Sequence, residues 1–355
     1  MLDVTLAHDY LVQVGGAERV VAHWAAGFDA RAVHTLAYRP ETTFEVFSGL
    51  DVRTAIPHVL ASQVERMLPA LPAIAERVTV TGGDVALVSS SGWAHRFRYD
   101  MPHVVYVHSP ARWLYAADDY RMRLSPLRRA GLRASTPLLR HGDAEAMLRA
   151  RRVVANSVVT RDRVHDAYGI DVEVVNPPVE PVAEVAQAPA RELPDEFAIV
   201  VARDRGYKNV ALAVSAARMA RMPIVIVGAG SESLDEPESG VYGVGCATDA
   251  ELCWLYRRAA VVVGSGHEDF GLTILEATLE GTPAATVAAG GYLETVREGV
   301  NGFHAASATP EALATAVLAA RELGADSCRE WGSGFRRDAH IARITRVLEE
   351  VVQRA

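Results

Sequence analysis

Short apolar runs alternate with amphipathic stretches along the whole chain, which is the pattern of parallel α/β domains. Apolar residues at helical spacing predict helices over 209–221 and 339–352. The apolar runs predict buried strands at residues 4–7, 85–90, 103–108, 153–156 and 172–176, and again at 197–202, 223–228, 241–245, 260–264 and 283–287. The chain therefore predicts two series of strands with helices between them.

Length and one change in composition predict two domains. The 355 residues exceed what one hydrophobic core usually organises. The Pro- and Ala-rich segment 181–196 separates the two strand series and has the composition of a linker. We expect two doubly wound Rossmann-like domains that face a central cleft, because ligands of such sheets bind at the carboxyl ends of the strands.

Composition argues against several classes of protein. The net charge of −8 argues against a general nucleic-acid binder. The three cysteines are too few and too irregularly spaced for a disulfide framework or a metal site. No apolar run is long enough to cross a bilayer, and the first residues lack the pattern of a signal peptide, so we expect a cytoplasmic protein.

The most informative segment is GSGHEDFGLTILEATLEGTP, residues 264–283, which follows a predicted strand and leads into a helix. Gly271 lets backbone approach a ligand closely, and the amides of Phe270, Gly271 and Leu272 at the helix N-terminus suit a phosphate. Glu268 and Glu276 are separated by seven residues. Taken alone, Glu276 is typical of an exposed helix carboxylate.

This segment resembles the glutamate, seven residues, glutamate pattern, with Phe-Gly inside, of the family 4 retaining glycosyltransferases of GT-B fold. Other stretches resemble that family in the same order along nearly the whole chain, and the shared order makes the resemblance specific. They are GGAERVV (15–21), YVHSPARWLY (106–115), VVANS (153–157), VVNPPVE (174–180), VARDRGYKN (201–209) and GGYLETVREGVNGF (290–303).

The resemblance implies a GT-B fold and assigns a role to each part of the chain. Residues 1–180 would form the acceptor-side Rossmann-like domain, and 181–196 the linker. Residues 197–335 would form the nucleotide-sugar-binding domain, and the C-terminal helix over 336–355 would pack back on the first domain. The implied activity is retaining, metal-independent transfer of a hexose from a nucleotide-diphosphate sugar. The subgroup that it resembles most is mannosyltransferase-like, so GDP-mannose is the first expected donor.

The chain holds thirty-five arginines and a single lysine, Lys208. By resemblance, Arg203 and Lys208 form the donor-phosphate motif. Negative charge grows on the leaving diphosphate as the glycosidic bond breaks, and preorganised positive charge stabilises it. Arg203 offers a bidentate fork, whereas Lys208 offers a compact ammonium that can reach one phosphate oxygen. On its residues alone, Lys208 is also compatible with the start of a surface helix.

The same resemblance implies roles for other residues. Glu268 would contact hydroxyls of the donor sugar, and Glu276 would accept hydrogen bonds from the ribose. His108, at the end of a predicted strand, would contact the transferred sugar or support the reacting face. Gly15 and Gly16 would let the first loop close over the donor phosphate and the acceptor, although on their residues alone they are also compatible with a plain turn. His8 also ends a strand, and we interpret it as a structural histidine.

We expect no bound cofactor, no metal and no nucleic-acid partner. Asp118-Asp119 is not the Asp-x-Asp motif that holds a metal in other glycosyltransferases. The expected partners are the nucleotide-sugar donor and an acceptor that the sequence does not identify: a glycan, a lipid-linked sugar or a small molecule.

Residues 121–152 carry nine arginines and only two acidic residues, interleaved with leucines. We interpret the segment as the solvated face of a helical insertion. The alternative is an electropositive rim that docks an anionic acceptor or an acidic membrane surface, which would place the protein peripherally at the inner face of a membrane. Pro126 and Pro137 are expected to interrupt any long amphipathic helix here.

Two other functions are compatible with these residues. A GT-B-fold sugar-nucleotide epimerase would bind the same donor and need no acceptor. A non-catalytic nucleotide-sugar-binding subunit would bind it without turnover.

Overall fold

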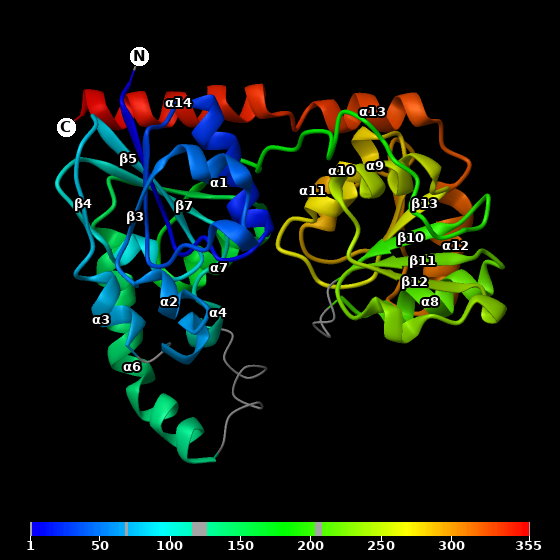
Figure 1. The fold of residues 1–355 in the computed structure, drawn as a ribbon, viewed down its shortest axis with the longest axis horizontal. Helices are drawn as coiled ribbons and strands as arrows, with labels where there is room; N and C mark the ends of the chain where they lie inside the picture. The colour runs from blue at the N-terminus through cyan, green and yellow to red at the C-terminus, as the bar shows by residue number, and fades with distance from the viewer. Residues whose placement is uncertain (1, 68–69, 116–125, 203–207, 355) are drawn as a thin grey trace. The chain divides into compact units, whose positions relative to one another are not determined.

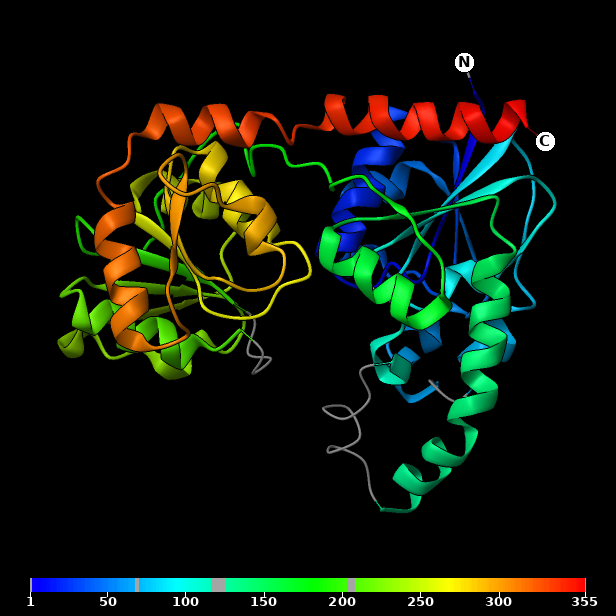
Figure 2. The same cartoon turned by 180° about the vertical axis from the view of Figure 1, so that it is seen from behind.

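The computed structural model describes residues 2–67, 70–115, 126–202 and 208–354, and the chain divides into two compact units. Unit 1 comprises Met1–Pro177 and Arg337–Ala355, and unit 2 comprises Pro178–Arg336. Each unit is a parallel sheet flanked by helices (Figures 1 and 2). Residues 181–196, expected as a linker, belong to unit 2, where Val182 is buried in the core.

Unit 1 is built on a seven-stranded parallel sheet of order β3-β2-β1-β5-β7-β8-β9. The chain winds outward from β1 to β3 and then returns to the other side of β1, so the direction of winding reverses between β1 and β5. A second sheet pairs β4 (Thr79–Val80) with β6 (Arg98–Tyr99). The main strands are β1 (Val4–His8), β2 (Ala32–Thr35), β3 (Asp51–Thr54), β5 (Val85–Ser90), β7 (His103–Val107), β8 (Arg152–Ala155) and β9 (Glu173–Val174).

Two helices from opposite ends of the sequence share a core with this sheet. Trp24 of α1 (Gly16–Gly27) and Leu348 of α14 (Arg337–Gln353) are fully buried in the same cluster as Leu6 and Leu87. Alternate residues of the strands, such as Val88, belong to a second cluster. The other helices of unit 1 are α2 (His58–Ala61), α3 (Leu71–Ala75), α4 (Arg112–Tyr115), α6 (Pro126–Leu148) and α7 (Val158–Tyr168).

Unit 2 repeats the architecture on a six-stranded parallel sheet of order β12-β11-β10-β13-β14-β15. Here the winding reverses between β10 and β13, which makes that edge the expected ligand position. The strands are β10 (Ala198–Val201), β11 (Ile224–Val227), β12 (Val241–Gly245), β13 (Val261–Gly264), β14 (Ala284–Val287) and β15 (Gly302–Ala305). The helices are α8 (Val210–Met219), α9 (Asp249–Arg258), α10 (Leu272–Leu279), α11 (Tyr292–Thr295), α12 (Pro310–Ala320) and α13 (Ala325–Ser333).

All ten predicted strands are confirmed, but β2, β3, β4, β6 and β15 were missed. β3 carries Asp51 and Arg53 and is largely exposed, so it has no apolar run to detect. The expectation that Pro137 interrupts the helix is wrong, because α6 runs continuously through it, whereas Pro126 is the first described residue of this helix. An interior proline removes one helical hydrogen bond, a cost that a long helix can carry.

Within the described residues, no helix combines the length and the apolar character needed to span a membrane. Of the nine arginines in 121–152, Arg140 donates to the Leu114 carbonyl and lies over the Tyr115 ring, and Arg152 pairs with Glu173. Part of the positive charge of this segment is therefore engaged within unit 1.

Candidate functional site

Lys208 and Glu268 form an ion pair at the carboxyl edge of the unit 2 sheet. Lys208 follows β10 and Glu268 follows β13, so the two side chains come from the two strands between which the winding reverses. Their side chains keep 15% and 17% of their surface exposed, which leaves both within reach of a ligand. The structure thus brings together two residues that lie sixty positions apart in the sequence, at the edge where such sheets bind ligands.

The loop that carries Glu268 is held from two sides. The Ser265 hydroxyl donates to the Lys208 carbonyl over 2.8 Å. On the other side, the Gly291 N–H donates to the Glu268 carbonyl over 2.9 Å. A Cβ at Gly290 would lie 2.4 Å from that carbonyl oxygen, and one at Gly291 would lie 2.2 Å from the Cα of residue 270. The two glycines therefore permit a backbone approach that any side chain would prevent.

Helix α10 begins directly after this loop. Its N-cap is Gly271, whose φ of 97° lies in the left-handed region that favours glycine. A Cβ at Gly271 would also contact the ring of Tyr292 at 3.0 Å. The Phe270 side chain is buried against Val179 and Phe335, so only the backbone of Phe270 is suited to meet a ligand. The first N–H groups of a helix lack helical partners, and Leu272 starts this one.

Glu276 lies one turn further along α10 and is buried, with 6% of its surface exposed. The Tyr256 hydroxyl of α9 donates to the Glu276 carboxylate over 3.2 Å. The exposed helix carboxylate that the residue alone suggests is therefore wrong. A buried carboxylate anchored by a tyrosine is a preorganised acceptor for hydroxyl groups.

A hollow of about 380 Å³ opens beside the ion pair, on the carboxyl ends of β13, β14 and β15. Its size falls in the range of small-molecule sites. It is lined by Asn209, Ser265–His267, Val287–Ala289 and Ala305–Ala308. Arg203, the other predicted phosphate contact, lies outside the described residues.

Gly15 and Gly16 stand at the start of α1 in unit 1. Gly15 is the N-cap in an extended conformation, and a Cβ there would lie 2.3 Å from Glu18 Oε2. Glu18 is buried and accepts a hydrogen bond from the Gln13 amide over 2.9 Å. Its carboxylate lies near the helix N-terminus, where negative charge is stabilised. The absence of a side chain at Gly15 thus leaves space for the Glu18 carboxylate.

His108 follows β7 in unit 1 and is hydrogen-bonded into a chain of three side chains. Its Nε2 lies 2.8 Å from the Ser89 hydroxyl, and the same hydroxyl lies 2.9 Å from Nδ1 of His8. His8 and Ser89 are register partners on β1 and β5, the strands between which the winding of unit 1 reverses. The three residues therefore meet at the corresponding edge of the first sheet.

Burial, together with the nearby imidazoles of His8 and His340, lowers the pKa of His108 to about 3. The ring is neutral around neutral pH. Tyr106 packs edge-on against both His108 and His340. His340 donates from Nδ1 to the Asn176 carbonyl over 2.7 Å and accepts the Trp24 indole N–H at Nε2 over 2.8 Å. These two bonds fix the neutral tautomer of His340, and burial lowers its pKa to about 4.

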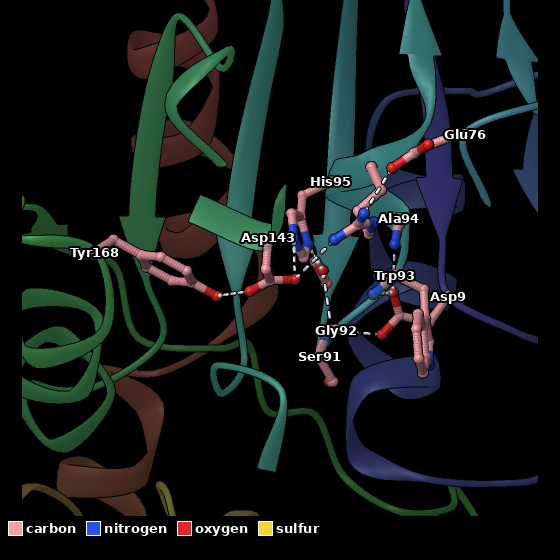
Figure 3. A network of polar contacts seen from close by, with 11 residues as sticks. Asp9, Glu76, Ser91, Gly92, Trp93, Ala94, His95, Asp143 and Tyr168 are labelled. Atoms are coloured by element: carbon pink, nitrogen blue, oxygen red, sulfur yellow. Dashed lines mark hydrogen bonds and ion pairs between the residues drawn. The ribbon is translucent and has the colours of Figure 1, made fainter. Parts of the chain in front are cut away.

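Figure 3 shows a second polar network at the end of β5. The buried carboxylate of Asp9 accepts three backbone N–H groups of the loop after β5, from Ser91 at 2.6 Å, Ala94 at 2.7 Å and Trp93 at 3.0 Å. Asp9 follows His8 directly, so it ties the end of β1 to the end of β5. This clamp fixes the backbone that frames the His8 and Ser89 pair.

Ser90, His95 and Asp143 follow one another in hydrogen bonds of 2.8 and 3.0 Å, the order found in hydrolase triads. All three are 1% exposed, and the Ser90 hydroxyl and both His95 nitrogens already have partners, because the Gly92 N–H donates to the Ser90 hydroxyl over 3.2 Å. Figure 3 shows His95 beside Asp143. Burial raises the pKa of the Asp143 carboxyl, but His95, Tyr168 and Arg96 together hold it below its usual value. We interpret this network as structural: it fastens α6 to the sheet.

The structure separates the predicted residues by unit. Unit 2 brings together Lys208, Glu268 and the start of α10, with Glu276 one turn away, and unit 1 holds His108, Gly15 and Gly16. Sequence reasoning missed Ser89, because a serine inside an apolar run gives no signal of its own. It treated His8 as structural, although the hydrogen bond through Ser89 joins His8 to His108.

Two family models match consecutive parts of the chain. The model described as Glycosyltransferase Family 4 matches residues 14–182, and the model described as Glycosyl transferases group 1 matches residues 183–337. Together they extend over both units.

Curated relatives and a solved structure are also similar to this chain. A D-inositol 3-phosphate glycosyltransferase of Geodermatophilus obscurus is 29% identical over 300 residues, which are 73% of this chain and 64% of the relative. One of Salinispora arenicola is 30% identical over 308 residues, 73% of this chain and 67% of the relative. The match thus spans slightly less than two thirds of the length of the first relative. The crystal structure of Anabaena HepE in complex with UDP shares the fold, with a TM-score of 0.69 at 17% identity over 98% of this chain and 100% of that one.

Proposed function

Because the chain belongs to the family 4 glycosyltransferases of GT-B fold, we propose that it transfers a hexose from a nucleoside-diphosphate sugar to a hydroxylated acceptor, with retention of configuration and without a metal. The observation that carries the proposal is the Lys208–Glu268 pair beside the start of α10, at the edge where the winding of unit 2 reverses.

The charges of this edge suit the departing diphosphate. As the glycosidic bond breaks, negative charge collects on the distal phosphate, and groups that are already in place stabilise it at no reorganisation cost. Lys208 supplies an ammonium, and the N-terminus of α10 supplies backbone N–H groups and the positive end of a helix dipole. Arg203, outside the described residues, would add a bidentate contact.

The two carboxylates suit opposite ends of the donor. Glu276, buried and hydrogen-bonded by Tyr256, would accept hydrogen bonds from the ribose hydroxyls. Glu268 is paired with the cation that binds phosphate, so it would lie at the junction of the diphosphate and the sugar, where it accepts sugar hydroxyls.

The configuration at the anomeric carbon is retained if the acceptor hydroxyl attacks from the same face of the sugar that the phosphate leaves. The leaving phosphate then takes the hydroxyl proton, and no separate enzymic base is required. His108 cannot serve as a cationic acid around neutral pH, because burial holds its pKa at about 3. We assign it the binding of a sugar hydroxyl by a neutral imidazole.

We propose the donor from a resemblance in sequence, and the acceptor from the names of the curated relatives. GDP-mannose stays our first donor, on the resemblance of the HSPARWLY and NPPVE segments to mannosyltransferase-like members. UDP-sugars are the competing class, because HepE binds UDP. D-inositol 3-phosphate is the first acceptor to test, since the curated relatives are named for it.

The test is a thermal-shift screen of the purified chain against GDP-, UDP-, ADP- and dTDP-sugars, followed by transfer assays. A ligand at ~100 times its dissociation constant should add about 2.7 kcal/mol of stability. The stabilising donor is then incubated with D-inositol 3-phosphate and other polyols, and products are followed by NMR. Conversion of donor alone into an isomer would indicate an epimerase, and donor binding without any turnover would indicate a binding subunit. Either result would overturn the proposal.

A further inference from the structure

The Ser89 hydroxyl lies between two imidazoles, and its chemistry restricts both of them. It is 2.9 Å from His8 Nδ1 and 2.8 Å from His108 Nε2, and all three side chains are buried. A hydroxyl has one proton and two lone pairs. Among the described residues Ser89 has no third partner for that proton, and an unpaired buried donor is costly, so the hydroxyl donates to one of these nitrogens and accepts from the other. Each neutral imidazole likewise carries one proton, on one of its two nitrogens.

Only two arrangements satisfy these bonds. If Ser89 donates to His108 Nε2, then His108 carries its proton on Nδ1, and His8 donates to Ser89 from its own Nδ1. If Ser89 donates to His8 Nδ1, then both rings carry their protons on Nε2. In both cases the two imidazoles have the same tautomer, although they face the hydroxyl with different nitrogens.

The remaining two nitrogens then have complementary properties. His8 Nε2 and His108 Nδ1 make no hydrogen bond within the described part of the chain. In the first arrangement His108 Nδ1 is a donor and His8 Nε2 an acceptor, and in the second the roles are exchanged. One donor and one acceptor remain in either case, which suits hydroxyl groups, since each of these both donates and accepts.

We propose that Ser89 couples His8 and His108 into one unit that offers a donor and an acceptor nitrogen to sugar hydroxyls, which makes Ser89 and His8 positioning and binding residues of this site. The inference rests on the proposed function. It is supported by the position of the three residues at the edge where the winding of unit 1 reverses, and by the Asp9 clamp on the adjacent loop. The low pKa of His108, which burial causes, keeps that ring in the neutral form that the argument uses.

The matched variants are Ser89→Ala and Ser90→Ala. Both serines are buried on β5 and both bond a histidine, but Ser90 bonds His95 and its side chain points to the other face of the sheet. We expect Ser89→Ala to lower kcat/KM for the donor sugar about tenfold, the effect of one lost hydrogen bond. Binding of free nucleoside diphosphate should not change. Ser90→Ala should leave kcat/KM per folded molecule unchanged. Ser89→Thr keeps a hydroxyl at this position, so its kcat/KM should equal that of the native chain.

A second measurement tests the coupling without any transfer reaction. Long-range ¹H–¹⁵N NMR of the imidazole rings identifies the tautomers of His8 and His108, with His8→Gln and His108→Gln used for assignment. We expect like tautomers in the native chain and loss of that correlation in Ser89→Ala. Unlike tautomers in the native chain would overturn the inference. An unchanged kcat/KM in Ser89→Ala would also overturn the inference. If Lys208→Ala were inactive in the same assay, the proposed function would remain intact. Absence of transfer by the native chain would instead overturn the proposed function and, with it, the assignment of a sugar ligand.

Discussion

Lys208, the single lysine of the sequence, forms an ion pair with Glu268 at the carboxyl edge of the unit 2 sheet. A diphosphate must therefore compete with the Glu268 carboxylate for the same ammonium. This relationship gives each partner a distinct consequence on mutation, because one of them attracts the phosphate and the other opposes it.

Replacement of Lys208 should reduce turnover far more than stability. Loss of one cation aimed at developing charge typically costs ~10²–10³ in rate. Lys208→Arg should also fail, because the planar fork does not reproduce a compact point charge. The matched control is Arg218→Ala, which removes an exposed cation paired with Glu236 in the same unit and should leave kcat unchanged. Full activity of Lys208→Arg would contradict the geometric part of this argument.

The two carboxylates should separate in calorimetry with free nucleoside diphosphate. Glu268→Gln removes the competitor for Lys208, so nucleotide affinity should stay equal or rise while transfer falls. Glu276→Gln retains an oxygen that can accept from Tyr256 but loses the carboxylate charge, so nucleotide affinity should fall about tenfold. Equal losses of nucleotide affinity in both variants would show that the two glutamates do not contact different ends of the donor.

A side chain at Gly291 should displace the loop that carries Glu268 and lower the stability of the chain. A Cβ there would lie 2.2 Å from the Cα of residue 270, so Gly291→Ala should cost roughly 1–3 kcal/mol and displace the loop, which also weakens nucleotide binding. Gly324 is the control: it too has a negative φ, and a Cβ there would meet nothing within 4 Å. Gly324→Ala should change stability by less than about 0.5 kcal/mol. Chemical denaturation of both variants measures the difference, and equal stabilities would contradict the packing argument.

Acidification should destabilise unit 1 through His340. Its pKa falls from 6.5 to about 4 on burial, so the unfolded chain binds the proton first as pH decreases. The stabilisation is complete above pH 6.5 and declines between 6.5 and about 4, by roughly 2 kcal/mol at pH 5. His340→Leu should lower stability at pH 8 and flatten this decline, whereas His141→Leu, at an exposed histidine, should leave the profile unchanged. A decline of the same steepness in His340→Leu would assign the pH dependence to other groups.

Local pattern was enough to predict ten of the strands and the helices α8 and α14, because a buried parallel strand needs a continuous apolar run. It was not enough for the short exposed strand β3, whose pairing with β2 depends on neighbours in space. The pairing of Lys208 with Glu268 and the environment of Glu276 are likewise tertiary. Ser89 shows the limit most clearly: its role arises from two histidines that arrive from β1 and from the end of β7.

The central claim is that protein cations and a helix N-terminus carry the charge of the leaving diphosphate during a same-face transfer. It is tested most directly by NMR of the transfer reaction in saturating EDTA, with the donor that the thermal-shift screen identifies and a competent acceptor. We predict that the rate is nearly unchanged by EDTA and that an α-linked donor gives an α-linked product, visible in the new anomeric coupling. Loss of activity in EDTA, or a product of inverted configuration, would contradict the account.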